Sequence, residues 1–290
     1  MIGGGHGHTD LKKAIYQSCD TFFYDLGNRM GIDTIHDFMS MFGFGENFAL
    51  DIPYARTGVL PSREWKKESR GEPWYRGDTI SSSIGQGYMW VTPLQLATAV
   101  SIVANKGKVV QPRMLKEIEG KEFVPQANAY PVPDVTLADA GYWDYMEDAM
   151  TMVIHRPFSA TEFRDYGTAF QAIAQADPDM PYKMAGKSGT AQLVGIDQAV
   201  LKSSDIEVAD IHKDHGLFVS FAPAQNSQVS PKIAVAVFVE NGEHGSSVAG
   251  PIAKQIIDAY LLDILEIDFA ALAAQEEVEE TAESLVTEAE

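Results

Sequence analysis

The sequence has a single cysteine, Cys19, so no disulfide bond can form within the chain. Basic residues are scarce: 22 Lys and Arg stand against 41 Asp and Glu, which gives a formal net charge of −19. This excess of negative charge argues against a nucleic-acid-binding protein. No apolar run is long enough for a membrane span, and we expect no membrane anchor or signal peptide within these 290 residues. The sequence also has no internal repeat and no glycine-rich phosphate loop.

The length and the distribution of charge predict one large folded region and a tail. A chain of 290 residues is long enough to bury a substantial core as one or two domains. From Glu266 to Glu290 there are acidic residues and no Lys or Arg. We therefore predict a folded domain over residues 1–265 and an acidic tail over residues 266–290 that stays out of the core.

One run of residues carries groups suited to peptide chemistry. Residues 187–192 read Lys-Ser-Gly-Thr-Ala-Gln and follow the small residues Ala185 and Gly186. The run predicts a strand with little side-chain bulk, whose edge could bind an extended peptide through main-chain hydrogen bonds. The Lys187 ammonium and the Ser188 and Thr190 hydroxyls suit recognition of a carboxylate and transfer of protons near a carbonyl. Taken alone, such a run also fits an ordinary turn.

Spacing of apolar residues and end signals predicts the other elements. A helix beginning at Thr9 or Asp10 should present Ser18 near its C-terminal end. The last helix, residues 246–264, has Val248, Ile252, Ile256 and Tyr260 on one apolar stripe. We predict further helices at 21–30, 34–42, 92–107, 134–153 and from 167; strands at 109–115, 215–222 and 232–240; irregular structure at 44–76; and a loop or insertion at 195–214.

A second segment, Ser18-Cys19-Asp20, favours a functional interpretation of residues 187–192 over an ordinary turn. An S-x-[DN] segment and a K-[ST]-G segment occur together, with S-x-x-K, in penicillin-binding proteins and serine β-lactamases. The chain resembles the penicillin-binding protein 2 family of Gram-negative rods up to about Leu265. The resemblance is carried by the segments 18–24, 77–80, 84–87 and 187–192, together with Trp65 and residues 73–75. It implies an α+β fold of the transpeptidase and β-lactamase type, with an antiparallel sheet flanked by helices.

The S-x-x-K motif of that family is missing. No serine is followed three residues later by a lysine, and Ser62 has Lys66 four residues on. The resemblance therefore implies that a membrane anchor, a non-catalytic pedestal and the helix with the nucleophile would lie before Met1. We expect this fragment alone to be inactive.

The resemblance also implies a function, a location and partners. The family is a peptidoglycan D,D-transpeptidase that cross-links stem peptides ending in D-Ala-D-Ala during cell elongation, at the periplasmic face of the inner membrane. By this resemblance Ser18, Asp20 and Lys187 are catalytic, and Ser188, Gly189, Thr190, Ala191 and Gln192 bind the substrate. Expected partners of the intact protein are β-lactams, a membrane glycosyltransferase and scaffold proteins of the elongation complex.

Catalysis in this family needs no cofactor, but some members hold a structural zinc with two Asp, one His and one Cys. By the resemblance, His6 and Cys19 match that His and that Cys. Both are residue types that zinc prefers. The two Asp ligands would lie upstream of this chain.

Other interpretations stay open at this point. The same fold serves serine β-lactamases and D,D-carboxypeptidases, although the aromatic segments 22–24 and 65–75 argue against them. A chain without the nucleophile could instead be a binding or interaction module. Individually, Ser18 could be a helix-end hydroxyl bonded to backbone, Asp20 a helix cap and Lys187 a solvated strand lysine. Residues 81–83 and Gln86 fit either a polar turn or a wall of the site.

Overall fold

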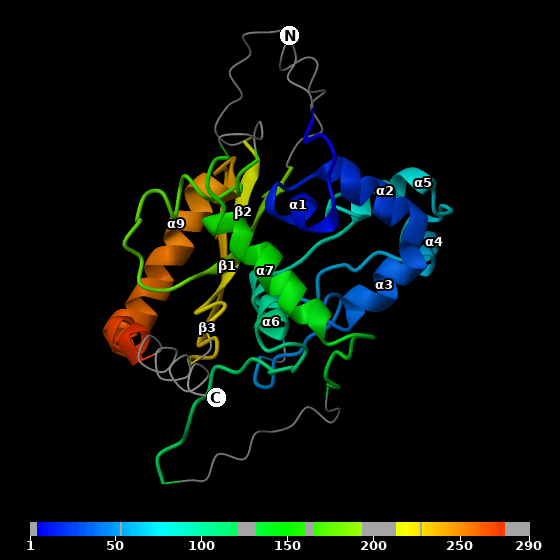
Figure 1. The fold of residues 1–290 in the computed structure, drawn as a ribbon. Helices are drawn as coiled ribbons and strands as arrows, with labels where there is room; N and C mark the ends of the chain where they lie inside the picture. The colour runs from blue at the N-terminus through cyan, green and yellow to red at the C-terminus, as the bar shows by residue number, and fades with distance from the viewer. Residues whose placement is uncertain are drawn as a thin grey trace, which may run out of the picture.

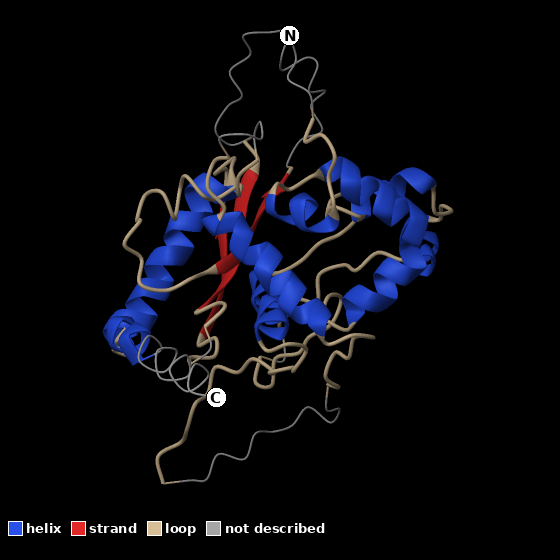
Figure 2. Ribbon diagram, viewed as in Figure 1, coloured by secondary structure: helices blue, strands red, loops and turns tan. Residues whose placement is uncertain are grey.

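A three-stranded antiparallel sheet lies at the centre of the structure, between helices (Figure 2). The computed structural model describes residues 5–52, 54–120, 132–159, 165–192, 213–226 and 228–275. The strands β1 (Ala185–Ala191), β2 (His215–Ala222) and β3 (Ile233–Val239) follow one another in sheet order. The predicted α+β class with an antiparallel sheet flanked by helices is confirmed, and the bounds of β2 agree with the sequence prediction.

Burial on the sheet fixes how β1 and β2 pair. Lys187 lies opposite Val219, and Gly189 lies opposite Leu217. Phe218 on β2 is fully buried, and a Cβ at Gly186 would lie 2.8 Å from its ring. Only glycine lets the two strands pack this closely at that point. A shift of one residue would turn Phe218 out of the core, so the register is strongly specified.

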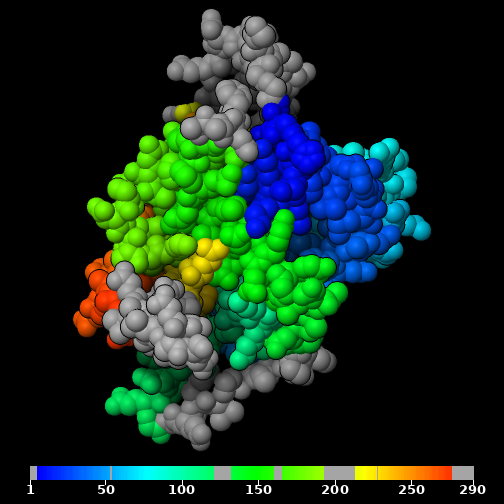
Figure 3. Space-filling view, viewed as in Figure 1, coloured from blue at the N-terminus to red at the C-terminus, as the bar shows by residue number. Residues whose placement is uncertain are grey.

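The helices surround the sheet on both sides. Figure 1 shows α9 on one side of the sheet and α6 and α7 on the other, and α1 packs on α7. The space-filling view in Figure 3 shows residues 141–159 and 165–192, in green, across the middle of one face, between the blue N-terminal segment and the orange-red C-terminal segment. The described helices are α1 (Leu11–Tyr16), α2 (Asp20–Met30), α3 (Ile32–Ser40), α4 (Arg63–Arg70), α5 (Arg76–Ser82), α6 (Pro93–Ala104), α7 (Gly141–His155), α9 (Gly245–Asp258) and the π-helix η2 (Ala259–Ile264).

Capping side chains fix where several helices begin. Asp10 accepts a hydrogen bond from the backbone N–H of Lys13 at the start of α1. Thr92 accepts from the N–H of Gln95, whose side chain accepts in return from the N–H of Thr92, and Pro93 fills the first position of α6. Such reciprocal caps satisfy N–H groups that have no partner inside the helix. The predicted starts at Asp10 and Thr92 are confirmed.

The buried residues form a main core and a smaller one. The main core lies between the sheet, α1, α7 and α9, and includes Val153, Ile173 and Phe221, each fully buried. The second core joins α6 to the loop after α3, through Phe42, Ile102 and Trp143 among others. Because α6 contributes Val100 to the first core and Ile102 to the second, this helix connects the two.

Several sequence predictions of structure are wrong. Residues 109–115 form no strand: they are irregular, and the Asp51 carboxylate accepts from the backbone N–H groups of Met114 and Leu115. The segment predicted as irregular contains α4, which Ser62 caps through the N–H of Trp65. Residues 168–176 form consecutive turns instead of a helix, and the helix predicted from residue 134 begins at Gly141. Most of the predicted loop or insertion at 195–214 lies outside the described residues.

Most of the apolar stripe predicted for the last helix faces outward, although Tyr260, in η2, packs against the main core. Val248, Ile252 and Ile256 are 37 to 43% exposed, while Ala249 and Ala253 are fully buried against the sheet. Small residues let the helix lie close to β2, as at Gly245, where a Cβ would be 2.0 Å from the carbonyl oxygen of Leu217. The pattern was ambiguous because both faces of this helix are apolar.

The core extends beyond the predicted domain boundary at residue 265. Phe269 is 6% exposed, and the centre of its ring lies 5.5 Å from that of Tyr182. The expectation that the tail stays out of the core is therefore wrong for Phe269, although the division into residues 1–265 and 266–290 stays a prediction. None of the helices in the described ranges is both long and apolar enough to cross a membrane.

Candidate active site

Most of the predicted site residues line one cleft, although they come from segments far apart in the sequence. The cleft has a volume of about 550 Å³. Its walls come from the connection between α1 and α2, from the start of α2, from the end of α5 and from β1. Of the predicted site residues, Ala191 and the two proposed zinc ligands, His6 and Cys19, are missing from the lining. The lining residues are Ser18, Asp20, Phe23, Tyr24, Ser83, Ile84, Gln86, Lys187, Ser188, Gly189, Thr190 and Gln192.

Ser18 lies in a tight turn rather than on a helix. Helix α1 ends at Tyr16, and Ser18 adopts a left-handed conformation with φ of 54°. The N–H of Cys19 then donates to the carbonyl of Ala14 at 2.9 Å, which closes the turn before α2 begins. Non-glycine residues seldom adopt this conformation, so surrounding contacts must hold it. The turn directs the Ser18 side chain into the cleft.

Lys187 contacts Ser18 directly. Its Nζ donates to the Ser18 hydroxyl and, at 2.8 Å, to the backbone carbonyl of Ser188. Removal from water lowers the pKa of Lys187 to about 8, and the nearby negative charge of Asp20 partly opposes this effect. An amine with a pKa near neutrality can both accept and return a proton at physiological pH. Ser18 and Lys187 therefore form a hydroxyl–amine pair suited to proton transfer, and Lys187 is not a solvated strand lysine.

Asp20 is the first residue of α2, where the helix dipole favours a negative charge. Cys19 is in the capping position, and its side chain makes no capping hydrogen bond. Asp20 lines the cleft, and its charge acts on Lys187. Asp20 thus places a negative charge beside the hydroxyl–amine pair.

The edge of β1 that faces away from β2 lies in the cleft. Among the described strands, β1 pairs with β2 alone. The carbonyl of Thr190 accepts from Nε2 of Gln86 at 2.8 Å, and the carbonyl of Ser188 accepts from Lys187. These two carbonyls therefore point into the cleft, where an extended peptide could reach them.

The hydroxyls of the same two residues also have partners. Oγ of Ser188 lies 3.4 Å from Oγ1 of Thr168, and Oγ1 of Thr190 donates to the carbonyl of Glu243 at 3.4 Å. Behind the strand, a Cβ at Gly245 would lie 2.0 Å from the carbonyl oxygen of Leu217. The first turn of α9 therefore lies directly on the sheet at the back of the site.

Some residues of the cleft fit two interpretations in the sequence, and others have no sequence signal. Ser83 and Gln86 line the cleft, whereas Ser82 is buried beneath it. Phe23 and Tyr24 were noted only as part of the family resemblance. Thr168 was missed altogether, because it lies in an irregular segment with no local signal and reaches Ser188 only through the tertiary fold.

The proposed zinc ligands do not form a site by themselves. His6 is exposed, and Cys19 is buried with its Sγ 3.3 Å from the Thr21 hydroxyl. The described residues contain no group of three or more His, Cys, Asp or Glu side chains placed to hold a metal ion. Structural zinc needs four ligands, so these two residues do not fit the ion without others.

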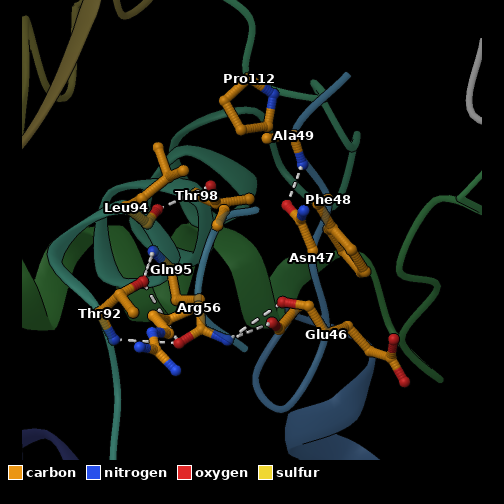
Figure 4. A pocket seen from close by; sticks show the side chains of 12 residues that line it. Glu46, Asn47, Phe48, Ala49, Arg56, Thr92, Leu94, Gln95, Thr98 and Pro112 are labelled. Carbon is orange, nitrogen blue, oxygen red and sulfur yellow. Dashed lines mark hydrogen bonds between the residues drawn. The ribbon is translucent and has the colours of Figure 1, made fainter. Parts of the chain in front are cut away.

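A second hollow, shown in Figure 4, is lined by residues that stabilise the fold. Nε2 of Gln95 donates to the carbonyls of Gly43, Glu46 and Thr57 at 3.1, 3.1 and 2.7 Å. Gln95 also caps α6, so all of its hydrogen-bonding groups are engaged. The remaining space is about 10 Å³, which is near the minimum for one water molecule. Gln95 therefore ties the loop after α3 to α6 and offers no ligand site.

The fold and the cleft together define a penicillin-binding transpeptidase domain. Residues 3–258 match the family described as "Penicillin binding protein transpeptidase domain", and the chain belongs to this family. The peptidoglycan D,D-transpeptidase MrdA of Haemophilus influenzae is 38% identical over 257 residues, covering 89% of this chain and 37% of that protein. MrdA of Acinetobacter baumannii is 41% identical over 261 residues, covering 89% of this chain and 35% of that protein.

Solved structures agree with this assignment. The crystal structure of Pseudomonas aeruginosa PBP2 in complex with WCK 5153 is 44% identical with a TM-score of 0.72, and the match covers 88% of this chain and 49% of that one. PBP2 of Helicobacter pylori, solved in complex with MreC, is 27% identical with a TM-score of 0.68, covering 89% and 41%. The chain thus spans less than half of the length of each of these relatives.

Proposed function

We propose that this chain supplies the substrate-binding and proton-transfer part of a peptidoglycan D,D-transpeptidase that acts during cell elongation. The observation that carries the proposal is the contact between Lys187 Nζ and the Ser18 hydroxyl, in a cleft beside the open edge of β1. Curated relatives named peptidoglycan D,D-transpeptidase support the same reaction.

The proposed reaction is acyl transfer through a serine ester. The nucleophile is the serine of an S-x-x-K motif, which these 290 residues do not contain. Its oxygen forms a bond to the D-Ala carbonyl carbon, and the amide bond to the last D-Ala breaks. An amine of a second stem peptide then attacks the ester, forms the new amide and releases the serine. Ser18 and Lys187 carry the proton from the attacking group to the leaving amine, and Asp20 orients them.

In this proposal, residues 188–192 hold the donor peptide along the edge of β1. The carbonyl of Thr190 accepts a hydrogen bond from the peptide backbone in place of Gln86. The ammonium of Lys187 and the hydroxyls of Ser188 and Thr190 bind the terminal carboxylate. Charge-assisted hydrogen bonds of this kind favour a free carboxylate over an amide at the end of the peptide.

We further propose that the reaction takes place at the periplasmic face of the inner membrane, with a membrane glycosyltransferase and scaffold proteins as partners. Two structures of relatives support such partners: PBP2 of Helicobacter pylori with MreC, and a structure described as a peptidoglycan synthase complex. The proposed acyl transfer needs no cofactor. A structural zinc on His6 and Cys19 would need two further ligands.

Titration with a stem-peptide analogue tests the proposed binding site. N-acetyl-Lys-D-Ala-D-Ala should perturb the backbone NMR signals of residues 187–192, and its C-terminal amide should bind more weakly. Lys187→Ala should weaken binding of the acid more than that of the amide. Equal binding of acid and amide, or perturbation confined to another surface, would refute the assignment. A labelled penicillin should form no adduct that survives denaturation, because no serine here has the lysine partner of the nucleophile.

A further inference from the structure

A buried carboxylate lies behind the Ser18 turn and outside the lining of the cleft. Asp165 is 1% exposed. An ionised carboxylate is costly to bury unless charged or polar groups surround it. The contacts of Asp165 therefore indicate what the residue holds in place.

The described partners of the Asp165 carboxylate lie either just before the Ser18 turn or just after α7. Oδ1 accepts from the Tyr16 hydroxyl at 2.5 Å and from Nε2 of Gln17 at 3.4 Å. Oδ2 accepts from Nη2 of Arg156 at 2.5 Å. The guanidinium of Arg156 in turn lies 5.3 Å from the centre of the Tyr16 ring. Tyr16 is the last residue of α1, and Gln17 immediately precedes Ser18. The Asp165 carboxylate therefore binds the two side chains that come just before the turn.

The same segment also contacts the residues of β1. The N–H of Thr168 donates to the carbonyl of Tyr16 at 3.1 Å. The hydroxyl of Thr168 lies 3.4 Å from the hydroxyl of Ser188. Gly167 is pressed onto α7, since a Cβ there would lie 2.2 Å from the carbonyl oxygen of Met152. Residues 165–168 are thus anchored on α7 and connect the Ser18 turn to the Lys187 strand.

Ser18 needs such an anchor because its left-handed backbone conformation is unfavourable for a residue with a side chain. Without contacts that hold Tyr16 and Gln17, the turn would relax and its hydroxyl would leave the Lys187 amine. We infer that Asp165 is a positioning residue, which acts through Tyr16, Gln17 and Arg156 to hold the Ser18 hydroxyl against Lys187. The inference rests on the proposed function only in giving this contact its role in proton transfer.

Asp165→Asn in the 290-residue chain tests the inference. The asparagine keeps the shape of the side chain and removes the charge that Arg156 and Tyr16 contact. The pKa of Lys187, measured by NMR titration of lysine labelled with ¹³C at Cε, should be about 8 in the unmodified chain. In the variant it should rise toward the ordinary value of 10.5, because a displaced turn admits water to the amine. Asp20 begins α2 two residues after Ser18, but its negative charge raises the pKa of Lys187 by less than removal from water lowers it.

Asp148→Asn is the matched control. Asp148 pairs with Lys12 and so links α1 to α7, as Asp165 does, but it contacts no residue of the turn among its described partners. This variant should leave the pKa of Lys187 unchanged. If Asp165→Asn remains folded and Lys187 still titrates at about 8, Asp165 is merely structural and the inference is refuted.

Tyr16→Phe decides the matter if Asp165→Asn does not fold. It removes only the hydroxyl that donates to Asp165, and it should raise the pKa of Lys187 in the same direction by a smaller amount. An unchanged Lys187 in folded Tyr16→Phe would then overturn the inference. Because the titration needs no substrate, its result stands apart from peptide binding: a chain that fails to bind the D-Ala-D-Ala peptide but shows the shift refutes the proposed function alone.

Discussion

Replacement of Gly27 by alanine should disturb the wall of the cleft through a single added methyl group. Helix α2 packs against the C-terminal end of α5 at Gly27, and a Cβ there would lie 2.3 Å from Cβ and 3.0 Å from Oγ of Ser83, the residue that follows α5. Real Cβ atoms do not approach each other so closely, so Ser83 must move. Since Ser83 lines the cleft, the displacement would reach the site.

Two opposing effects set the magnitude. Alanine in a helix interior is favoured over glycine by about 0.8–1 kcal/mol, whereas overpacking a tight contact costs about 1–3 kcal/mol. Gly27→Ala should therefore lower the free energy of unfolding by about 0–2 kcal/mol instead of raising it. In a Ser83→Gly background the clash is absent, so the same substitution should raise the free energy of unfolding by up to about 1 kcal/mol. The coupling between the two sites is then roughly 1–3 kcal/mol.

Urea unfolding of the four proteins in this double-mutant cycle, followed by circular dichroism, measures that coupling. Peptide titration of the same proteins reports the effect on the cleft, where Gly27→Ala should weaken binding and the double variant should restore it. A Gly27→Ala chain that is stabilised by about 1 kcal/mol in both backgrounds would show that α2 and α5 do not touch at this point.

Three further predictions concern other parts of the molecule. Phe269→Ala should lower the free energy of unfolding by about 3–5 kcal/mol and the melting temperature by about 5–8 °C. Ile264→Ala is the control, because Ile264 is 68% exposed and its replacement should have little effect. Equal shifts in the two variants would place Phe269 outside the core. Burial lowers the pKa of His155 to about 4. The free energy of unfolding should therefore fall by on the order of 3 kcal/mol as the pH drops from about 6.5 to 4. A flat profile in that range would contradict the burial of a neutral His155. His155→Gln should remove this dependence. Gln86→Ala should tighten binding of the D-Ala-D-Ala peptide about 2- to 10-fold by freeing the carbonyl of Thr190, and weaker binding would show that Gln86 instead contacts the peptide.

The sequence was informative where the signals are local. Capping residues located the starts of α1 and α6, and alternation gave the bounds of β2. The candidate site residues were found because two short motifs retain their order and chemistry, and the fold brings both into one cleft.

Predictions failed where distant contacts decide the local structure. The Asp51 carboxylate takes the N–H groups of residues 114 and 115, which a strand would have used in a sheet. The turn at Ser18 depends on Asp165, which lies 147 positions along the chain from it, and no pattern around Ser18 announces a left-handed residue. Because Asp165 is so far from Ser18 in the sequence, only the fold shows that the two lie close together.

The hydrogen bonds on the open edge of β1 also affect how the protein behaves in concentrated solution. A strand of small residues with unpaired carbonyls is a template on which a second molecule can add a strand and begin to aggregate. Here Lys187 and Gln86 donate to the carbonyls of Ser188 and Thr190, so a neighbouring chain would have to displace both side chains before it could pair. In the proposed function, the carboxylate of the donor peptide offsets that displacement, and a strand without a carboxylate has no such compensation. The two side chains therefore keep the edge open to a ligand and closed to self-association.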